Sequence, residues 1–132
     1  MKHAWNAVVL DSQALSLWLD SDREFMARLN ELAATSTPLV VCANTLIELA
    51  KHPAHRRLDW LISRTRVEPV TTEVARVAAD LLRNSHMTGH RQAIDASMVA
   101  VALRLIPPVA IMTSDPVDIH RLSQSHLDIL PL

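Results

Sequence analysis

The chain has 132 residues, a length typical of one globular domain with no room for a second independent core, so we expect a single domain over residues 1–132. Hydrophobic residues make up 49% of the sequence and charged residues 20%, which excludes an intrinsically disordered chain. The formal net charge of −1 provides no general attraction for nucleic acid, so nucleic-acid binding would need a local basic patch.

Cysteine content and the N-terminal segment bear on the cellular compartment. Cys42 is the only cysteine, which excludes a secreted scaffold held together by intrachain disulfides. The apolar run that ends at Asp11 is too short and too interrupted for a signal peptide or a membrane span. We therefore expect a cytoplasmic protein.

The first half of the chain alternates between short apolar runs and segments of helical periodicity. Pro38 introduces the second apolar run, and Pro53 interrupts the helical pattern that follows it. In chain order the expected elements are a strand at 7–10, helices at 12–19 and 22–34, a strand at 39–42, and helices at 45–51 and 55–64.

The second half of the chain continues this alternation. Gly89 marks a turn, and the segment after it is so apolar that its helix should be buried nearly all round. Pro107 and Pro108 end that helix. The expected elements are a strand at 67–70, helices at 72–85 and 93–106, a strand at 109–112, a helix at 116–124 and an edge strand at 127–130.

Strands that alternate with helices predict right-handed crossovers and parallel pairing. We therefore expect an α/β fold with three α/β/α layers around a central, mainly parallel sheet of four or five strands. In such a sheet the junctions from strand to helix share one edge. Side chains that are distant in sequence can then meet in the crevice outside the carboxyl ends of the strands.

Four acidic residues are expected at this edge, each where an apolar segment meets the first turn of a helix. They are Asp11, Glu48, Asp95 and Asp115. Taken singly, each is best explained as a helix cap, with Thr45 and Glu48 spaced as a capping box and Asp115 standing before a proline at the first helical position.

Taken together, the four acids indicate a bound cation. Like charges gathered at one edge repel and raise one another's pKa unless a cation compensates them. Carboxylate oxygens without additional cysteines or paired histidines favour Mg²⁺ or Mn²⁺ over zinc. Gly89 argues against paired histidines, because it interrupts the segment between His86 and His90.

Four segments carry a resemblance to a known family. In chain order they are VVLDSQALSLWL, NTLIELA, AIDASMVAVAL and IMTSDPVDIH. They resemble the PIN domain, and the short length of the chain resembles the VapC type of bacterial toxin ribonuclease. The resemblance implies an acidic quartet of Asp11, Glu48, Asp95 and Asp115 that holds one or two divalent cations. Such a site activates water for in-line attack on an RNA phosphodiester.

The resemblance also suggests supporting residues around the quartet. Thr113 matches a hydroxyl residue two positions before the fourth acid, and Ser12 could orient a ligand in the same way. Asp118 stands three residues after Asp115, whereas the additional acid of the family more often stands two residues after. Asp118 is therefore open to two interpretations, as a ligand or as a residue that only stabilises the start of its helix.

The most basic stretch of the chain, residues 52–66, carries arginines around Trp60. The arginines are Arg56, Arg57, Arg64 and Arg66. They could contact RNA phosphates, or they could be an ordinary solvated helix face. In the resembling family this region also contributes to dimerisation and antitoxin binding.

The resemblance therefore implies a Mg²⁺- or Mn²⁺-dependent endoribonuclease, the toxin of a type II toxin–antitoxin pair, with a cognate antitoxin protein as partner and a homodimeric state. A catalytically silent PIN-like binding module and a housekeeping RNA-processing nuclease are the alternatives. A phosphoacceptor receiver domain is disfavoured, because Ser12 follows Asp11 where a paired acid is required and no lysine occurs after Lys51. Neither the RNA cleaved, nor the identity of the antitoxin, nor the number of metal ions follows from the sequence.

Overall fold

Five short strands pair into one β-sheet in the computed structural model, which describes residues 4–132. The strands are β1 (Ala7–Leu10), β2 (Leu39–Cys42), β3 (Arg66–Glu68), β4 (Val109–Thr113) and β5 (Asp128–Pro131). They lie in the order β3-β2-β1-β4-β5, and every neighbouring pair is parallel. The expected α/β fold with a mainly parallel sheet of four or five strands is confirmed, and the observed sheet has five strands in wholly parallel pairing.

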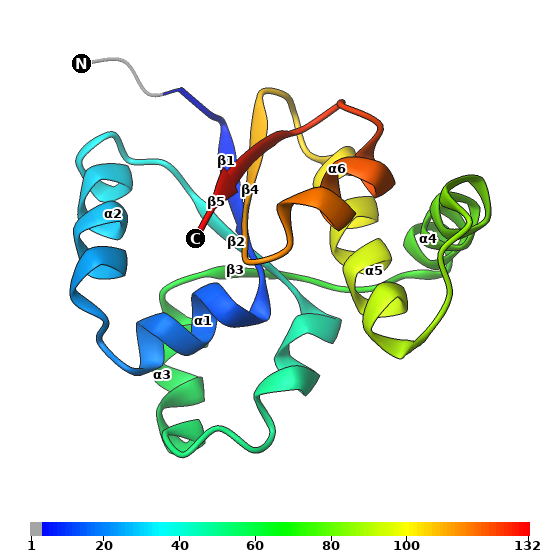
Figure 1. Cartoon of the computed structure of the whole chain (residues 1–132). Coiled ribbons are helices and arrows are strands. Elements are labelled where there is room, and N and C mark those ends of the chain that lie inside the picture. The colour runs from blue at the N-terminus through cyan, green and yellow to red at the C-terminus, as the bar shows by residue number, and fades with distance from the viewer. Residues whose placement is uncertain (1–3) are drawn as a thin grey trace.

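Helices cover both faces of this sheet, which gives the three layers seen in Figure 1. One face carries α1 (Ser12–Leu19), α2 (Arg23–Ala34) and α3 (Leu58–Ser63). The other carries α4 (Thr72–Ser85), α5 (His90–Arg104) and α6 (Pro116–Ser123). Within residues 4–132, none of these helices has both the length and the apolar character that crossing a membrane requires.

The connection between β2 and β3 differs from the expectation. The segment expected as a helix at 45–51 is a 3₁₀ helix, η1 (Ala43–Leu49), and the next is a short 3₁₀ turn, η2 (His55–Arg57), that leads into α3. Pro53 keeps the first segment short, and 3₁₀ geometry is common in short connecting pieces. Strand β3 ends at Glu68 rather than at residue 70, because Pro69 has no N–H for the ladder.

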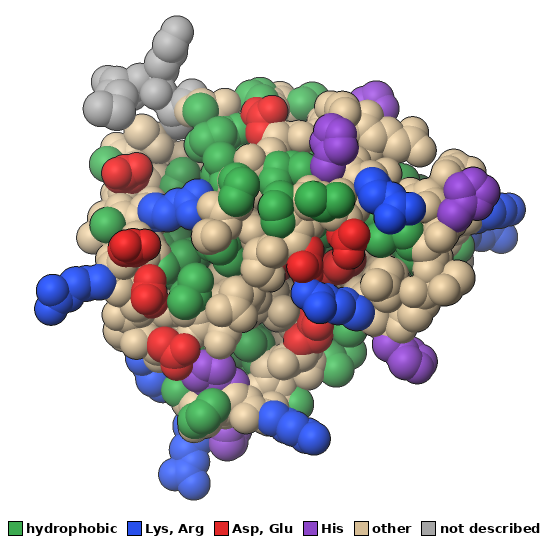
Figure 2. All heavy atoms as spheres, viewed as in Figure 1, with side chains coloured by type: hydrophobic (Ala, Val, Ile, Leu, Met, Phe, Trp, Pro, Cys, Tyr) green, Lys and Arg blue, Asp and Glu red, His purple; other side chains and the backbone are tan. Residues whose placement is uncertain are grey.

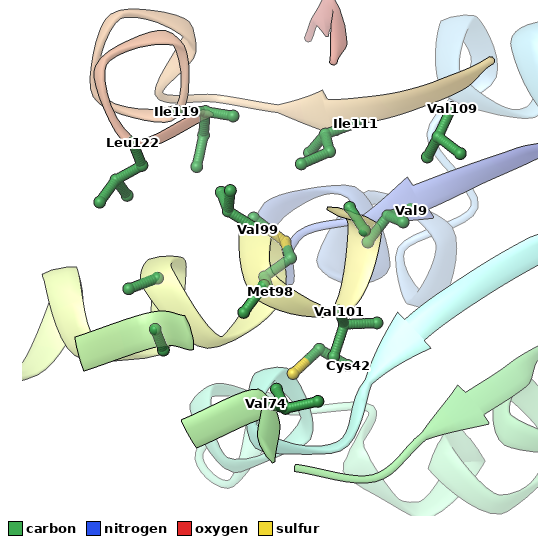
Figure 3. Packing of buried hydrophobic residues seen from close by; sticks show 14 of the residues in the cluster. Val9, Cys42, Val74, Met98, Val99, Val101, Val109, Ile111, Ile119 and Leu122 are labelled. Carbon is green, nitrogen blue, oxygen red and sulfur yellow. The ribbon is translucent and has the colours of Figure 1, made fainter. Parts of the chain in front are cut away.

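The core lies on both faces of the sheet, because successive side chains of a strand point to opposite faces. In β1, Val8 and Leu10 pack toward α1 and α2, whereas Val9 packs toward α5. Figure 3 shows α5 enclosed by hydrophobic side chains from the sheet and from α4 and α6. Residues 95–102 of α5 are all buried, so the expectation of a helix buried nearly all round holds for this part of α5.

The topology brings three segments to one edge of the sheet. Leu10 of β1 pairs with Met112 of β4, so the two strands end side by side and the residues that follow them are neighbours. Helix α5 precedes β4 and crosses back over the sheet, so its first turns lie at the same carboxyl edge (Figure 1). This edge is where the four acids of the sequence were expected.

Candidate active site

A cleft of about 370 Å³ opens at the carboxyl edge of the sheet. Its lining comes from the start of α1, from η1, from the first turns of α5 and from the segment after β4. The lining residues are Asp11, Ser12, Gln13, Glu48, His90, Arg91, Ile94, Asp95, Ser114 and Asp115. All four acids singled out in the sequence thus line one cleft, and Figure 2 shows acidic side chains grouped around basic ones on this face.

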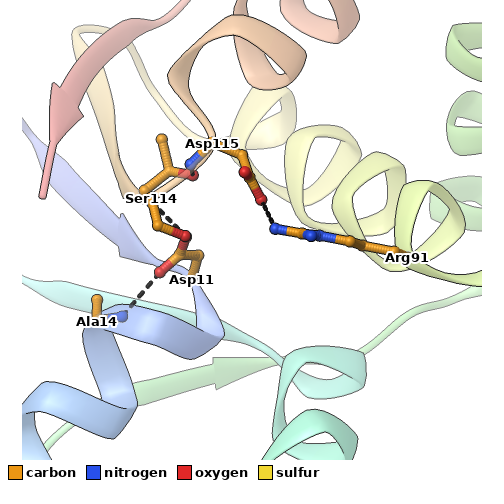
Figure 4. Close-up of polar contacts among 6 residues, drawn as sticks. Asp11, Ala14, Arg91, Ser114 and Asp115 are labelled. Atoms are coloured by element: carbon orange, nitrogen blue, oxygen red, sulfur yellow. Dashed lines mark hydrogen bonds and ion pairs between the residues drawn. The ribbon is translucent and has the colours of Figure 1, made fainter.

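Asp11 joins the ends of two strands. It caps α1, where its carboxylate accepts hydrogen bonds from Ala14 N at 2.8 Å and from Ser114 N at 2.9 Å (Figure 4). Its side chain is almost completely buried, and burial raises the pKa of the Asp11 carboxyl although the two amide donors act in the opposite direction. Asp11 is therefore both the helix cap that the sequence suggested and a rigidly held wall of the cleft.

Asp95 lies in the second turn of α5 rather than at its start, because the helix begins at His90 and not at residue 93. Asp95 is 9% exposed, and its Oδ2 atom is buried without a hydrogen-bond partner among the described residues. Burial, followed by the charges of Glu48 and Asp115, raises the pKa of Asp95 to about 7. A buried acceptor without a donor costs about 1–3 kcal/mol, so this atom requires a proton or a cation.

Asp115 precedes Pro116, the first residue of α6, as the sequence suggested, but its carboxylate does not cap that helix. The carboxylate instead accepts a hydrogen bond from the guanidinium of Arg91, which reaches across from the first turn of α5 (Figure 4). The backbone N–H of Asp115 donates to the Thr113 hydroxyl at 2.9 Å. Thr113, the last residue of β4, therefore holds the backbone of Asp115 in place.

Glu48 reaches the cleft from the 3₁₀ helix η1. The capping box expected from Thr45 and Glu48 is wrong, because η1 begins at Ala43 and Thr45 lies inside it rather than at its N-cap. The buried Thr45 hydroxyl has no hydrogen-bond partner among residues 4–132. Glu48 is exposed and contributes negative charge, which raises the pKa of Asp95.

The other residues named from the sequence fall inside and outside the cleft. Ser12 is part of its lining, whereas Asp118 lies in the first turn of α6 and is not among the described residues that form the lining. Arg91 was missed, although it stands four residues before Asp95 and would share its helix face. Placing the start of the helix at Gly89, which adopts φ +114°, would have revealed this spacing.

The basic stretch lies outside the cleft lining. Trp60 of α3 is 39% exposed, with the guanidinium groups of Arg57 and Arg64 at 4.9 Å and 5.7 Å from its ring centre. Arg57 also donates to the carbonyl of Leu19 at 3.0 Å, and Arg66 forms an ion pair with Glu68 at 2.8 Å. Much of this positive charge is thus engaged in contacts within the chain.

The chemistry of the four acids fits a divalent cation such as Mg²⁺, since they supply only hard oxygen donors and one of these, Asp95 Oδ2, is buried without a partner. Nevertheless, no three acidic, histidine or cysteine side chains of the described residues lie close enough together to hold one ion. Arg91 on Asp115 and the backbone amides on Asp11 already occupy oxygens of two of the acids. The donor set therefore fits a metal, and Arg91 occupies part of it.

Comparisons with known proteins agree with this architecture. A model of the PIN domain matches residues 8–116. The solved structure of VapBC2 from Rickettsia felis, bound to a DNA fragment from its promoter, aligns over 96% of this chain and 98% of its own with a TM-score of 0.70 and 14% identity. A toxin–antitoxin complex from Klebsiella pneumoniae aligns over 92% and 95% with a TM-score of 0.67 and 15% identity.

A third structure is more distant. VapC20 of Mycobacterium tuberculosis, a toxin that cleaves the sarcin–ricin loop, aligns over 74% of this chain and 82% of its own with a TM-score of 0.54 and 19% identity. No curated protein matches the chain in sequence. At these identities the solved structures establish a shared fold, while the match over residues 8–116 covers most of the chain.

Proposed function

Because this chain belongs to the PIN domain family, we propose that it is a metal-dependent endoribonuclease that acts as the toxin of a type II toxin–antitoxin pair. The observation that carries the proposal is the buried Oδ2 atom of Asp95, which has no hydrogen-bond partner within residues 4–132 and lies in a cleft shared with three other acids. A carboxylate with a strongly perturbed pKa in a cleft is a recognised mark of a functional site.

In this proposal the four acids are the metal ligands. Asp11, Glu48, Asp95 and Asp115 would hold Mg²⁺ or Mn²⁺, which supplies charge neutralisation and makes a water molecule a stronger nucleophile toward phosphorus. Asp11 is held in place by two backbone amides. Asp95, with a pKa of about 7, binds or releases a proton near neutral pH.

Polar groups around the acids would position the RNA. Ser12, Gln13 and Ser114 line the cleft and offer hydroxyl and amide groups to a phosphate or a ribose. The arginines of residues 56–66 would contact the RNA backbone farther from the cleft. Arg56 could make such a contact, because it is exposed and forms no ion pair among the described residues.

The central experiment measures RNA cleavage by the purified chain. We expect cleavage of cellular RNA in Mg²⁺ or Mn²⁺, no cleavage in EDTA, and loss of cleavage in Asp95→Asn. Asp118→Asn is the matched control, because it removes an acid three residues beyond Asp115 that lies outside the cleft lining. Cleavage by Asp95→Asn at the rate of the unmodified chain would refute the catalytic assignment.

A catalytically silent PIN-like binding module is the second candidate. The ion pair between Arg91 and Asp115 and the lack of three closely spaced ligands among residues 4–132 favour it. A chain that folds, shows no cleavage in any divalent metal, yet binds a partner protein would support this candidate.

The proposed role as a toxin depends on a partner protein and not on the residues of the cleft. The similarity in fold to VapBC2 and to a toxin–antitoxin complex supports an antitoxin partner. The proposal includes a homodimer in the cytoplasm, which size measurement in solution would test. Expression of the chain should arrest growth, and a neighbouring antitoxin gene should relieve the arrest. Cleavage without growth arrest would instead favour a housekeeping RNA-processing nuclease.

A further inference from the structure

Arg91 stands out among the residues of the acidic cleft. Its guanidinium donates to Asp115 Oδ2, and its side chain is 62% exposed at the cleft mouth. It lies four residues before Asp95, so both side chains project from the same face of α5 into the cleft. Arg91 thus joins α5 to the start of α6 through an ion pair across the cleft.

The electrostatics of the cleft centre on this side chain. The hydrogen bond and charge of Asp115, followed by the charges of Asp95 and Glu48, raise the pKa of Arg91. Among the described residues that line the cleft, Arg91 is the sole arginine or lysine. One guanidinium therefore offsets part of the negative charge of three acids on three different segments.

We propose that Arg91 is a built-in counter-ion, which occupies Asp115 in the metal-free protein and must leave it when a divalent cation binds. The inference rests on the metal-dependent function proposed above. Two physical reasons support the exchange. A guanidinium and a metal ion compete for the same carboxylate oxygen, and two cations at one site repel each other.

The structure around the pair is consistent with this exchange. Asp115 is drawn toward Arg91, while Asp95 remains buried without a partner for Oδ2. The Arg91 side chain is largely exposed and that of Asp115 is partly exposed, so the ion pair is a weak interaction that a divalent cation can displace. Arg91 would thus lower the metal affinity of the cleft without closing it.

The test measures Mn²⁺ affinity by isothermal titration calorimetry, with no RNA present, on the full chain at pH 8. We expect Arg91→Gln to bind Mn²⁺ about two- to fivefold more tightly than the unmodified chain, the range that corresponds to loss of one exposed ion pair. Arg91→Lys keeps the charge and should remain closer to the unmodified chain. Arg83→Gln is the matched control, because Arg83 forms an exposed ion pair with Asp80 on α4 and its loss changes the net charge equally.

Thermal melting in EDTA provides a second readout. Arg91→Gln should melt about 1–4 °C lower than the unmodified chain, because the acids lose their counter-ion, and saturating Mn²⁺ should remove the difference. Arg83→Gln should not show this dependence on metal. A structural role for Arg91 alone would give a loss in melting temperature that Mn²⁺ does not restore.

The outcomes separate this inference from the proposed function. If the unmodified chain binds Mn²⁺ and Arg91→Gln binds it equally or more weakly, the counter-ion role is wrong while the metal site stands. If neither the unmodified chain nor any variant binds Mn²⁺, the metal site and the counter-ion role are both wrong. Tighter binding in Arg91→Gln but not in Arg83→Gln supports the exchange.

Discussion

Each of two walls of the acidic cleft buries one carboxylate to a similar degree, but the two carboxylates differ in their hydrogen bonding. Asp11, on the wall formed by β1 and α1, is 7% exposed and accepts two backbone hydrogen bonds. Asp95, on the α5 wall, is 9% exposed and has a buried oxygen with no donor among the residues that the structure describes. Burial alone therefore does not identify the acid that requires a cation, whereas an unsatisfied acceptor does.

The difference follows from where each acid stands in its helix. Asp11 precedes α1, where the first N–H groups have no partner within the helix and are free to donate. Asp95 lies inside α5, where backbone N–H groups are already bonded to carbonyls four residues earlier. Its donor must therefore come from outside helix α5, and among residues 4–132 none is present.

The largest expected effect concerns catalysis, in which both walls should matter equally. Asp11→Asn and Asp95→Asn should each lower the rate of RNA cleavage by at least about a thousandfold, because loss of outer-sphere partners of a metal ligand already costs about 10- to 100-fold. Initial rates in saturating Mn²⁺ measure this. A loss confined to one of the two variants would show that only one wall serves the reaction.

The next largest effect concerns the pH dependence of stability in EDTA. The pKa of Asp95 is about 7 in the folded chain and about 3.9 in the unfolded one, so between these values the folded state binds more protons. The contribution of Asp95 to the free energy of unfolding should therefore be fully present below about pH 4 and be lost as pH rises to about 7, by at most about 4 kcal/mol. Urea unfolding of the unmodified chain and of Asp95→Asn across this range isolates the contribution, which should vanish in the variant.

Alanine substitutions of the buried acids on the two walls should change the free energy of unfolding in opposite directions, in metal-free protein at pH 8. Asp11→Ala removes a helix cap and should destabilise the fold by about 1–2 kcal/mol. Asp95→Ala removes an unsatisfied buried charge and improves helix propensity, so it should stabilise the fold by about 1–2 kcal/mol after the small void is subtracted. Urea unfolding checks both signs, and the same sign for both variants would contradict the comparison.

The smallest expected effect lies outside both walls. Arg56→Ala should change the free energy of unfolding by less than about 0.5 kcal/mol and leave Mn²⁺ affinity unchanged, because Arg56 is exposed and does not line the cleft. If Arg56 contacts an RNA phosphate, the slope of log affinity for single-stranded RNA against log salt should decrease by about 0.7. An unchanged slope would exclude this contact.

The alternation of apolar runs and helical segments was sufficient to predict the parallel α/β fold, since the central strands β1, β2 and β4 are short, mostly buried runs and each is followed by a helix. The first turn of α5 was not predicted, because its residues His90 and Arg91 are polar and lack the apolar periodicity of the buried part. The Thr45–Glu48 spacing led to the wrong prediction of a capping box. The same four residues can cap a helix or lie within a 3₁₀ helix, and here the 3₁₀ helix η1 begins directly after β2, before Thr45.

The sequence by itself was enough to predict that the four acids lie at one edge of the sheet, because strands that alternate with helices pair in parallel and their junctions share that edge. Only the tertiary structure decided how each acid is satisfied. Asp11 receives an amide from Ser114, 103 positions away, Asp115 receives Arg91 from another helix, and Asp95 Oδ2 receives nothing from the described chain. Such partners come from segments distant in sequence, and hydrogen bonding and burial depend on where those segments meet in space.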